Sequence, residues 1–405
     1  MSTTLPVGPA AAAVDRPLRE SGRPVGLWPF LGVAVTSLGG PLALAALYAP
    51  SIVADASASA GLVMLSAAVV FGVVPLVIWL RYSRHVASSG GLYAFVEAAA
   101  GRRVAMVQGV IWVFSYLLYL LYTTASIVYD TLPAVLPGVR PYQPLLEIAI
   151  PVALAGVMLA GRAVTLVVTG LLAAGQMVLV GVLAGVSIDH AAPLSSFGSG
   201  APTGSAVTAV GQTALLYICG SLPLFLGGEV VRPHRTVRRG LIAGYLVVAA
   251  GVVAAVFPLA ADPAFTRAPI PGMSVARVFA GHNLAVAIGI GVAASVAGVM
   301  LVEFLALSRV LHAMTARPVR PIIAGLSAAL VVAAPFSLIN PDKFYDSLLK
   351  PSLAALWLSQ LIVFAVYPAF AARHGARRAP ACALAAAASA FAVYGLWATL
   401  HHAST

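Results

Sequence analysis

The chain has 405 residues, of which 61% are hydrophobic and only 9% are charged, and its mean hydropathy is +0.99. A soluble domain carries about 25% charged residues, so this composition excludes a water-soluble protein and requires lipid around the chain. The net charge of +11 does not indicate nucleic-acid binding, because the basic residues lie between hydrophobic segments. The two cysteines, Cys219 and Cys382, lie inside such segments and predict neither a disulfide framework nor a metal site.

A helix needs about 20 apolar residues to cross a bilayer, and the sequence contains eleven segments near that length. They are predicted at 27–49, 58–80, 104–132, 145–161, 164–186, 206–230, 240–261, 284–311, 319–339, 348–371 and 381–400. Residues 1–25, rich in Ala and Pro, are expected to form a disordered cytoplasmic tail. No segment is long and polar enough to form a soluble domain, so we expect the function to reside among the helices.

The basic residues indicate how the chain crosses the membrane. With the N-terminus in the cytoplasm, the inner segments hold eighteen of the 23 Lys and Arg residues, as the positive-inside rule requires. The outer segments hold Arg140, Arg267, Arg277, Lys343 and Lys350. We therefore predict a multi-pass protein of the plasma (inner) membrane whose C-terminus lies outside.

Two of the segments carry helix breakers at their centres. The first contains Ser37-Leu38-Gly39-Gly40-Pro41, and the sixth contains Cys219-Gly220-Ser221-Leu222-Pro223. Gly costs roughly 1 kcal/mol and Pro about 3 kcal/mol inside a helix, although both are common in membrane helices and Gly permits close packing. Matched breaks in corresponding segments of two halves point instead to a transporter binding site.

The two broken segments each begin a group of five, which predicts an all-α inverted repeat. The first repeat spans 26–186 and the second spans 206–371, and 372–405 add a peripheral helix with a short outer tail. Because five is odd, the second repeat enters the membrane from the opposite side. The eleven-helix count depends on a very tight turn at Gly161-Arg162.

Four stretches resemble the amino acid–polyamine–organocation transporter superfamily, whose members have the leucine-transporter fold. They are SLGGPL (37–42), SGGLYAFVEAAAGR (89–102), LLYICGSLPLFLGGEVVRPHRTVRRG (215–240) and LALSRVLHAM (305–314). The resemblance implies a secondary transporter of amino acids or related amines. Two features depart from it: Gly220 stands where the family usually has a gating aromatic, and Gln176 stands where some proton-coupled relatives have a Lys that replaces sodium.

The chemistry of the breaks suggests roles for the residues around them. Free N–H groups at a half-helix N-terminus suit a carboxylate, so the backbone around Ser37–Gly40 is expected to bind the substrate carboxylate. Carbonyls around Ile218–Ser221 would bind its amino group. The candidate substrate-binding residues are Ser37, Leu38, Gly39, Gly40, Tyr119, Tyr217, Ile218, Cys219, Gly220 and Ser221.

Few ionisable residues lie in the hydrophobic segments, and such residues are candidates for function. Glu303 is either a proton or cation site or a carboxylate near the inner interface that pairs with a loop arginine. Glu97 and Glu229 are expected to form ion pairs or an inner gate, whereas Gln176 either contacts substrate or joins two helices. Tyr119 belongs to an aromatic stripe with Tyr116 and Tyr122, which indicates either packing or ligand contact.

The sequence therefore predicts a permease that works by alternating access, with proton or exchange coupling. An exporter or exchanger, and a channel or non-transporting sensor of the same fold, remain alternatives because sequence does not encode the direction of flux. No phosphate-binding loop, zinc-binding spacing or Ser/His/Asp constellation stands out, so we expect no enzyme activity, no cofactor and no nucleic-acid partner. The expected partners are a small-molecule substrate, H⁺ and the lipid bilayer.

Overall fold

The computed structural model describes residues 24–50, 72–190, 219–260, 265 and 268–402. These residues form helices joined by short connections, with one isolated parallel β-bridge between Val25 and Val230. The first half contains α2 (Leu27–Ser37), α3 (Pro41–Ala43), η1 (Leu44–Tyr48), α6 (Val74–Ser83), α7 (Leu92–Ala100), α8 (Arg102–Ala125), η4 (Ser126–Thr131), α9 (Leu132–Val135), η5 (Pro137–Tyr142), α10 (Gln143–Leu159) and α11 (Arg162–His190). The second half contains η7 (Cys219–Leu226), α13 (Pro233–Ala260), α15 (Pro271–Phe279), α16 (His282–Thr315), α17 (Val319–Ala333), η8 (Ala334–Leu338), α18 (Pro341–Arg373) and α19 (Arg378–His402).

Nine stretches of helix in the described part are long and apolar enough to cross a membrane. They are Leu27–Tyr48, Arg102–Val135, Pro137–Leu159, Arg162–His190, Pro233–Ala254, His282–Thr315, Val319–Leu338, Pro341–Arg373 and Arg378–Leu400. Each corresponds to one predicted segment. The eleven predicted segments are called helix 1 to helix 11 below, in chain order, so that helix 1 is 27–49 and helix 6 is 206–230. The other two predicted segments, 58–80 and 206–230, lie partly outside the described residues. The structure therefore confirms a polytopic all-α membrane protein and leaves the total of eleven a prediction.

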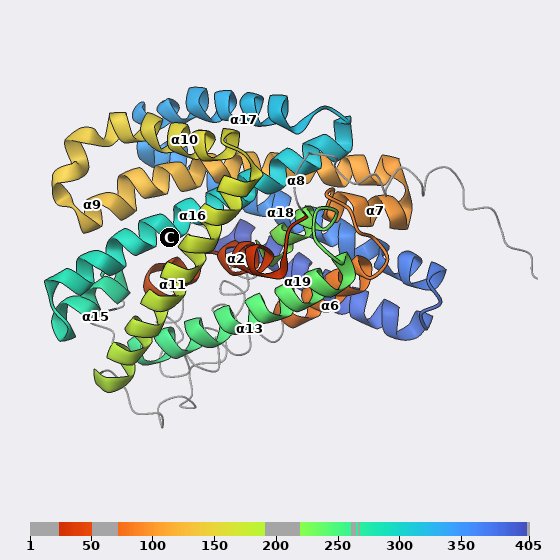
Figure 1. Ribbon diagram of the computed structural model, residues 1–405, viewed down its shortest axis with the longest axis horizontal. Coiled ribbons are helices and arrows are strands. Elements are labelled where there is room, and N and C mark those ends of the chain that lie inside the picture. Colours follow the sequence, from red (N-terminus) through yellow and green to blue (C-terminus); the bar gives the residue numbers. More distant parts are fainter. Residues whose placement is uncertain (1–23, 51–71, 191–218, 261–264, 266–267, 403–405) are drawn as a thin grey trace, which may run out of the picture.

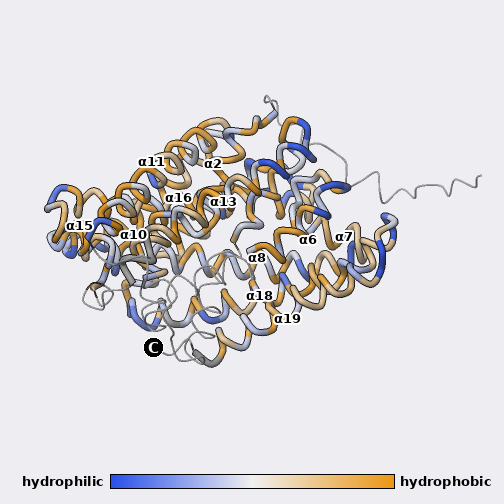
Figure 2. The backbone as a smooth tube through the Cα atoms, turned by 90° about the horizontal axis from the view of Figure 1, so that it is seen from below, coloured by the Kyte–Doolittle hydropathy of each residue, from blue (hydrophilic) through white to orange (hydrophobic). Residues whose placement is uncertain are grey.

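The helices at the centre of the bundle are mostly buried, and those at its edge are more exposed. Figure 1 shows α2, α11, α13 and α16 crossing at the centre, with α10 and α17 side by side along one edge. In an apolar window of 18 residues, 83% of the window is buried in the stretch Leu27–Tyr48, whereas only 28% is buried in Pro137–Leu159. In Figure 2 hydrophobic residues run along the lengths of the helices and hydrophilic segments gather near their ends. This distribution suits a bundle whose outer face is covered by lipid.

Two glycines explain why the first membrane helix is interrupted. Gly39 and Gly40 have φ angles of 69° and 68°, in the left-handed region that L side chains avoid. The chain therefore ends α2 at Ser37 and starts again at Pro41, which suits the first position of a helix because it lacks an N–H. The predicted break in helix 1 is confirmed.

A tight turn separates α10 from α11, as the sequence predicts. Gly161 adopts a φ of 110°, and its N–H donates to the carbonyl oxygen of Met158 at 3.2 Å. The next helix then begins at Arg162. Because no other residue type tolerates this φ easily, the glycine fixes the reversal that keeps 145–161 and 164–186 as two helices.

Candidate functional site

The two breaks lie side by side at the centre of the bundle. A Cβ atom added to Gly220 would lie 3.0 Å from Leu38 Cδ2 and 3.7 Å from Trp79. Leu38, Trp79 and Gly220 also line one small cavity of about 10 Å³. The space beside Gly220, where an aromatic was expected from the resemblance, is thus filled by side chains from helix 1 and helix 2.

The break in helix 1 leaves backbone donors exposed to the interior. The N–H groups of Leu38 and Gly40 donate to Val35 and Thr36 carbonyl oxygens at 3.4 and 3.2 Å. Among the described residues, the N–H groups of Gly39 and Leu42 have no such partner. Unpaired backbone donors in a membrane interior cost several kcal/mol each, so these two are open to an acceptor.

A side-chain hydrogen bond joins the break in helix 6 to helix 10, which is α18. Gln360 on α18 donates from Nε2 to Ser221 Oγ at 3.3 Å, and both side chains are buried. Cys219 and Gly220 open the short helix η7 and are buried as well. Tyr217 and Ile218, also candidates from the sequence, lie outside the described residues.

Gln176 joins three helices through a single hydroxyl group. Ser295 Oγ donates to Gln176 Oε1 at 2.6 Å and accepts from the N–H of Ala43 at 3.2 Å. These atoms belong to α11, α16 and α3, which follows the break in helix 1. Gln176 therefore forms the helix-to-helix hydrogen bond that was one of its two predicted roles, immediately beside the break.

Glu303 carries a fully buried carboxyl group. Its side chain is 0% exposed, and neither carboxylate oxygen has a partner among the described residues. The predicted alternative, an ion pair with a loop arginine, is not present in this part of the chain. The groups within electrostatic range of Glu303 include Tyr116, Tyr119 and Cys219. An isolated ionised carboxylate is very costly in such surroundings.

The aromatic stripe of helix 3 connects Glu303 with a second polar cluster. Tyr116 is buried, and the rings of Tyr119 and Tyr122 stack with their centroids 5.7 Å apart. The hydroxyls of Tyr122 and Tyr345 are 2.6 Å apart, and Tyr345 interacts in turn with Asp130. The stripe is thus partly packing and partly a polar row that leads from Glu303 to Asp130.

Glu229 holds together the opposite end of the bundle. Its Oε2 accepts from Arg162 at 2.9 Å and its Oε1 accepts from Arg309 at 3.1 Å. The side chains of Glu229 and Arg309 are almost completely buried. The N–H of Val25 donates to the Glu229 carbonyl oxygen at 2.8 Å, and the N–H of Val231 donates to the Val25 carbonyl oxygen at 2.9 Å. The cluster joins the start of helix 1, the end of helix 6, the α10–α11 turn and α16.

Glu97 is less central than the other predicted acids. It lies on α7, half-buried, beside Arg102 and Tyr93. Burial raises the pKa of Glu97, and the charge of Arg102 and a hydrogen bond from Tyr93 oppose that shift. In the part of the chain that the structure describes, Glu97 has no recorded interaction with either break.

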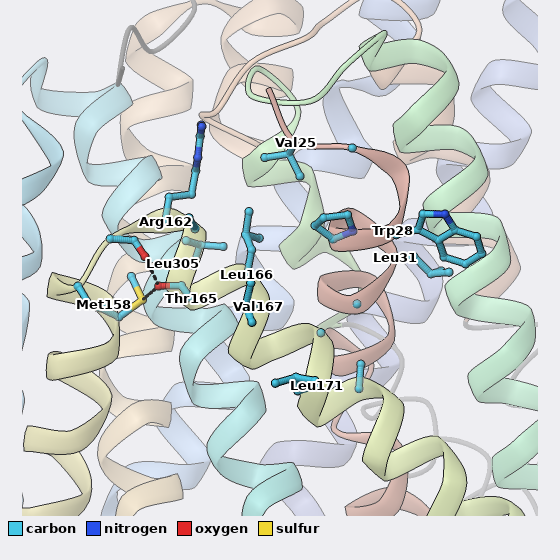
Figure 3. A pocket seen from close by; sticks show the side chains of 18 of the residues that line it. Val25, Trp28, Leu31, Met158, Arg162, Thr165, Leu166, Val167, Leu171 and Leu305 are labelled. Carbon is cyan, nitrogen blue, oxygen red and sulfur yellow. Dashed lines mark hydrogen bonds between the residues drawn. The ribbon is translucent and has the colours of Figure 1, made fainter. Parts of the chain in front are cut away.

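A large groove lies beside helix 1 but does not include the breaks. It has a volume of about 1430 Å³ and runs between α2, α11 and α16 (Figure 3). Figure 3 shows Leu166, Val167 and Leu171 of α11 along it, with Arg162 at one end. Trp28, Leu171 and Val167 are 78%, 69% and 61% exposed. Such apolar exposure suits contact with lipid.

One buried acid was missed by the sequence analysis. Glu147 on α10 is 0% exposed, and its carboxylate oxygens have no hydrogen-bond partner among the described residues. Ser337 of η8 and Tyr129 lie nearby. Its place near the start of an apolar segment resembles an ordinary interface residue, so no pattern in the sequence distinguishes it.

The fold is that of known membrane transporters. No protein-family model and no curated protein matches the chain. It is similar to the solved structure of Mhp1, a nucleobase-cation-symport-1 family transporter in a closed conformation with bromovinylhydantoin bound, with a TM-score of 0.60 and 13% identity over 96% of this chain and 93% of that one. It is also similar to MhsT in complex with L-phenylalanine, with a TM-score of 0.60 and 14% identity over 91% of this chain and 98% of that one. The chain therefore has the leucine-transporter fold, and the resemblance seen in the sequence is confirmed at the level of fold.

Proposed function

We propose that the chain is a secondary active transporter that moves an amino acid or a related amine across the plasma membrane by alternating access. The observation that carries the proposal is the pair of adjoining breaks in helices 1 and 6. Half-helix ends at the centre of a membrane bundle offer opposite partial charges to a small zwitterion.

The substrate carboxylate would lie at the N–H groups of Gly39 and Leu42. Neither donor has a partner in the described part of the chain. Gly39 precedes α3, the part of helix 1 after the break, and Leu42 lies in its first turn. The amino group would lie at the carbonyls that precede η7, around Ile218–Ser221. Leu38 and Trp79 beside Gly220 would then limit the size of the side chain that fits.

Glu303 is the proposed coupling group. Because it is fully buried and has no counter-ion among the described residues, the carboxyl group would be stable when it holds a proton and unstable when it loses it. Its electrostatic contact with Cys219 and Tyr119 links its charge to the helix 6 break and the stripe of helix 3. Gln176, Gly40 and Ser295 close the gap between helices 1, 5 and 8 through a hydrogen bond and a close backbone approach.

The cluster around Glu229 is the proposed inner gate. It connects four parts of the chain at the end of the bundle where the arginines gather, through two charged hydrogen bonds and two backbone hydrogen bonds. Opening towards that side would require Glu229 to release Arg162 or Arg309. The exchange or export of substrate uses the same parts, so the direction of flux follows from the gradients and not from the site.

An aromatic heterocycle is the second candidate substrate. The site is bordered by Trp79, Tyr116 and Tyr119, and flat rings stack well on aromatic side chains. One of the two similar structures contains bromovinylhydantoin, whereas the other contains L-phenylalanine. Binding experiments therefore have to include both chemical classes.

The test is a ligand screen followed by transport. The purified protein is heated with each amino acid, amine, nucleobase and hydantoin, because a ligand at 100 times its dissociation constant stabilises by about 2.7 kcal/mol. A ligand that stabilises the protein is then loaded into proteoliposomes for counterflow. Saturable counterflow supports a carrier, whereas flux that follows the gradient without counterflow would identify a channel. Binding without any flux would identify a sensor.

A further inference from the structure

A second cavity lies where the end of α6 meets the end of α18, and none of the residues that line it belongs to the breaks. It has a volume of about 400 Å³. Five of the side chains that line it are basic: Arg81, Arg84, His85, His374 and Arg377. We call it the basic cavity. Its walls come from α6, α18 and the first turn of α19, so segments distant in the sequence bring these charges together.

Among the residues that the structure describes, no negative charge compensates the basic cavity. No Asp or Glu lines it, and none of its five basic side chains forms a salt bridge with an acid in the described part of the chain. Arg81 donates from Nη1 to the neutral hydroxyl of Tyr367 at 3.0 Å. Like charges that face a shared space repel one another, so the arrangement is stabilised when an anion occupies that space.

The histidines add donors that depend on pH. The rings of His85 and His374 are 4.2 Å apart, and His374 Nδ1 donates to the Phe370 carbonyl oxygen at 2.9 Å. His234, at the start of α13, donates from Nδ1 to the Ser83 carbonyl oxygen at 2.8 Å. Because a carbonyl only accepts, Nδ1 carries the hydrogen in both of these rings.

The charge of His85 is linked to the occupancy of the cavity. Burial lowers the pKa of His85, and the neighbouring His374, His234 and Arg84 lower it further. In the absence of an anion these surroundings therefore favour the neutral ring of His85. A bound anion favours the charged ring, so binding takes up a proton and anion affinity rises as the pH falls. Further charged or titratable groups on α6, α18 and α19 include Tyr82, Tyr367, Arg373 and Arg378.

The backbone around the cavity also offers donors in preference to acceptors. The last carbonyls of α18 are capped within its own turn, because Ala371 accepts from the N–H groups of His374 and Ala376, and Ala372 accepts from Gly375. The following helix, α19, begins at Arg378, and its first turn lines the cavity. The N-terminus of a helix carries partial positive charge and suits an anion.

We propose that the basic cavity binds a phosphate group, carried either by a soluble phosphate or by the headgroup of an anionic lipid. Planar arginine side chains bind phosphate oxygens in pairs, and Arg84 and Arg377 are exposed and able to do so. The cavity opens at the end of the bundle where the basic loops gather, which is also where anionic headgroups are found. The proposal is independent of the transported substrate.

The experiment uses the full-length protein in detergent, with inorganic phosphate as one probe and lipid as the other. Thermal unfolding is followed during a phosphate titration at about pH 6 and about pH 8, on either side of the ordinary histidine range. In parallel, the protein is placed in nanodiscs of phosphatidylcholine with or without phosphatidylglycerol. The test variant is Arg84→Gln with Arg377→Gln. The control is Arg103→Gln with Arg317→Gln, which removes the same charge from exposed positions outside the cavity.

We expect stabilisation in at least one arm, stronger at the lower pH, with affinity reduced about tenfold or more in the test variant and unchanged in the control. A response to phosphate alone identifies a soluble ligand, and a response to phosphatidylglycerol alone identifies a lipid. Equal responses of the test and control variants in both arms would overturn the proposal, as would the absence of any response. A test variant that fails to fold is replaced by Arg377→Gln alone, whose side chain lies on the surface.

Discussion

Ser295 donates a hydrogen bond to Gln176 at 2.6 Å while its hydroxyl oxygen accepts from the N–H of Ala43. One hydroxyl thus fixes α3, the part of helix 1 after the break, against α11 and α16. The helix that is interrupted at Gly40 is joined to the bundle again about one turn later, at Ala43, and this hydrogen bond fixes the position of the chain at the break.

Ser295→Ala is expected to destabilise the protein by about 1–3 kcal/mol, because it leaves a buried N–H and a buried amide oxygen unpaired. The free energy of unfolding is measured by chemical denaturation in detergent. Thr399→Ala is the matched control, since its buried hydroxyl donates only within its own helix, to Gly395. If both variants lose the same amount, the bridge has no special role.

Gly40→Ala is expected to lose about 2 kcal/mol or more. Ala resists a φ of 68° by roughly 1–2 kcal/mol, and the new Cβ would lie 2.5 Å from Ser295 Oγ. Gly325→Ala in α17, where no atom lies within 4 Å of the added carbon, is expected to leave the stability equal or slightly higher. The melting temperatures of the two variants are compared by thermal unfolding. Equal effects would show that the break does not require glycine at position 40.

Glu303→Gln is expected to keep the fold and to abolish the pH dependence of uptake. The substitution preserves shape and removes the ionisable group from a site that supplies no counter-ion in the described part. Uptake into proteoliposomes is measured over a range of external pH, with Glu97→Gln as the control from the periphery of the bundle. Proton coupling through Glu303 would be rejected by a variant that retains the wild-type pH profile.

Glu229→Gln is expected to open the inner end of the bundle. The two arginines lose their charged partner, and breaking a buried pair costs about 3–5 kcal/mol. Cys219 at the helix 6 break is buried, whereas Cys382 is exposed, so a Cys382→Ser background leaves Cys219 as a reporter. We expect severalfold faster maleimide labelling of Cys219 when Glu229→Gln is added.

Two controls frame the labelling experiment. Glu97→Gln in the same background removes an equal charge and is expected to leave the labelling rate unchanged. Thermal unfolding shows whether Glu229→Gln remains folded at the labelling temperature. Labelling that stays slow in a folded Glu229→Gln variant would show that the cluster is purely structural.

Local sequence features predicted the interrupted helix, the tight turn and the basic end of the bundle. Gly39, Gly40 and Gly161 need special φ angles that only the local chain determines, so their breaks are visible in the sequence. What fills the space beside Gly220 was not predictable, because Leu38 and Trp79 come from other helices. For the same reason, periodicity could not reveal that Glu147 turns inward or that His85 meets His374.

The bridge between Val25 and Val230 consists of main-chain atoms alone. Side-chain substitution therefore leaves this tie intact, and an alanine scan would pass over it. It is sensitive instead to whatever changes the path of the backbone, such as Val231→Pro, which removes a donor, or an inserted residue before Leu27, which shifts the register. A force applied to the chain at Val25 is therefore shared between α2, which begins two residues later, and the end of helix 6, which is tied to Val25 by two hydrogen bonds.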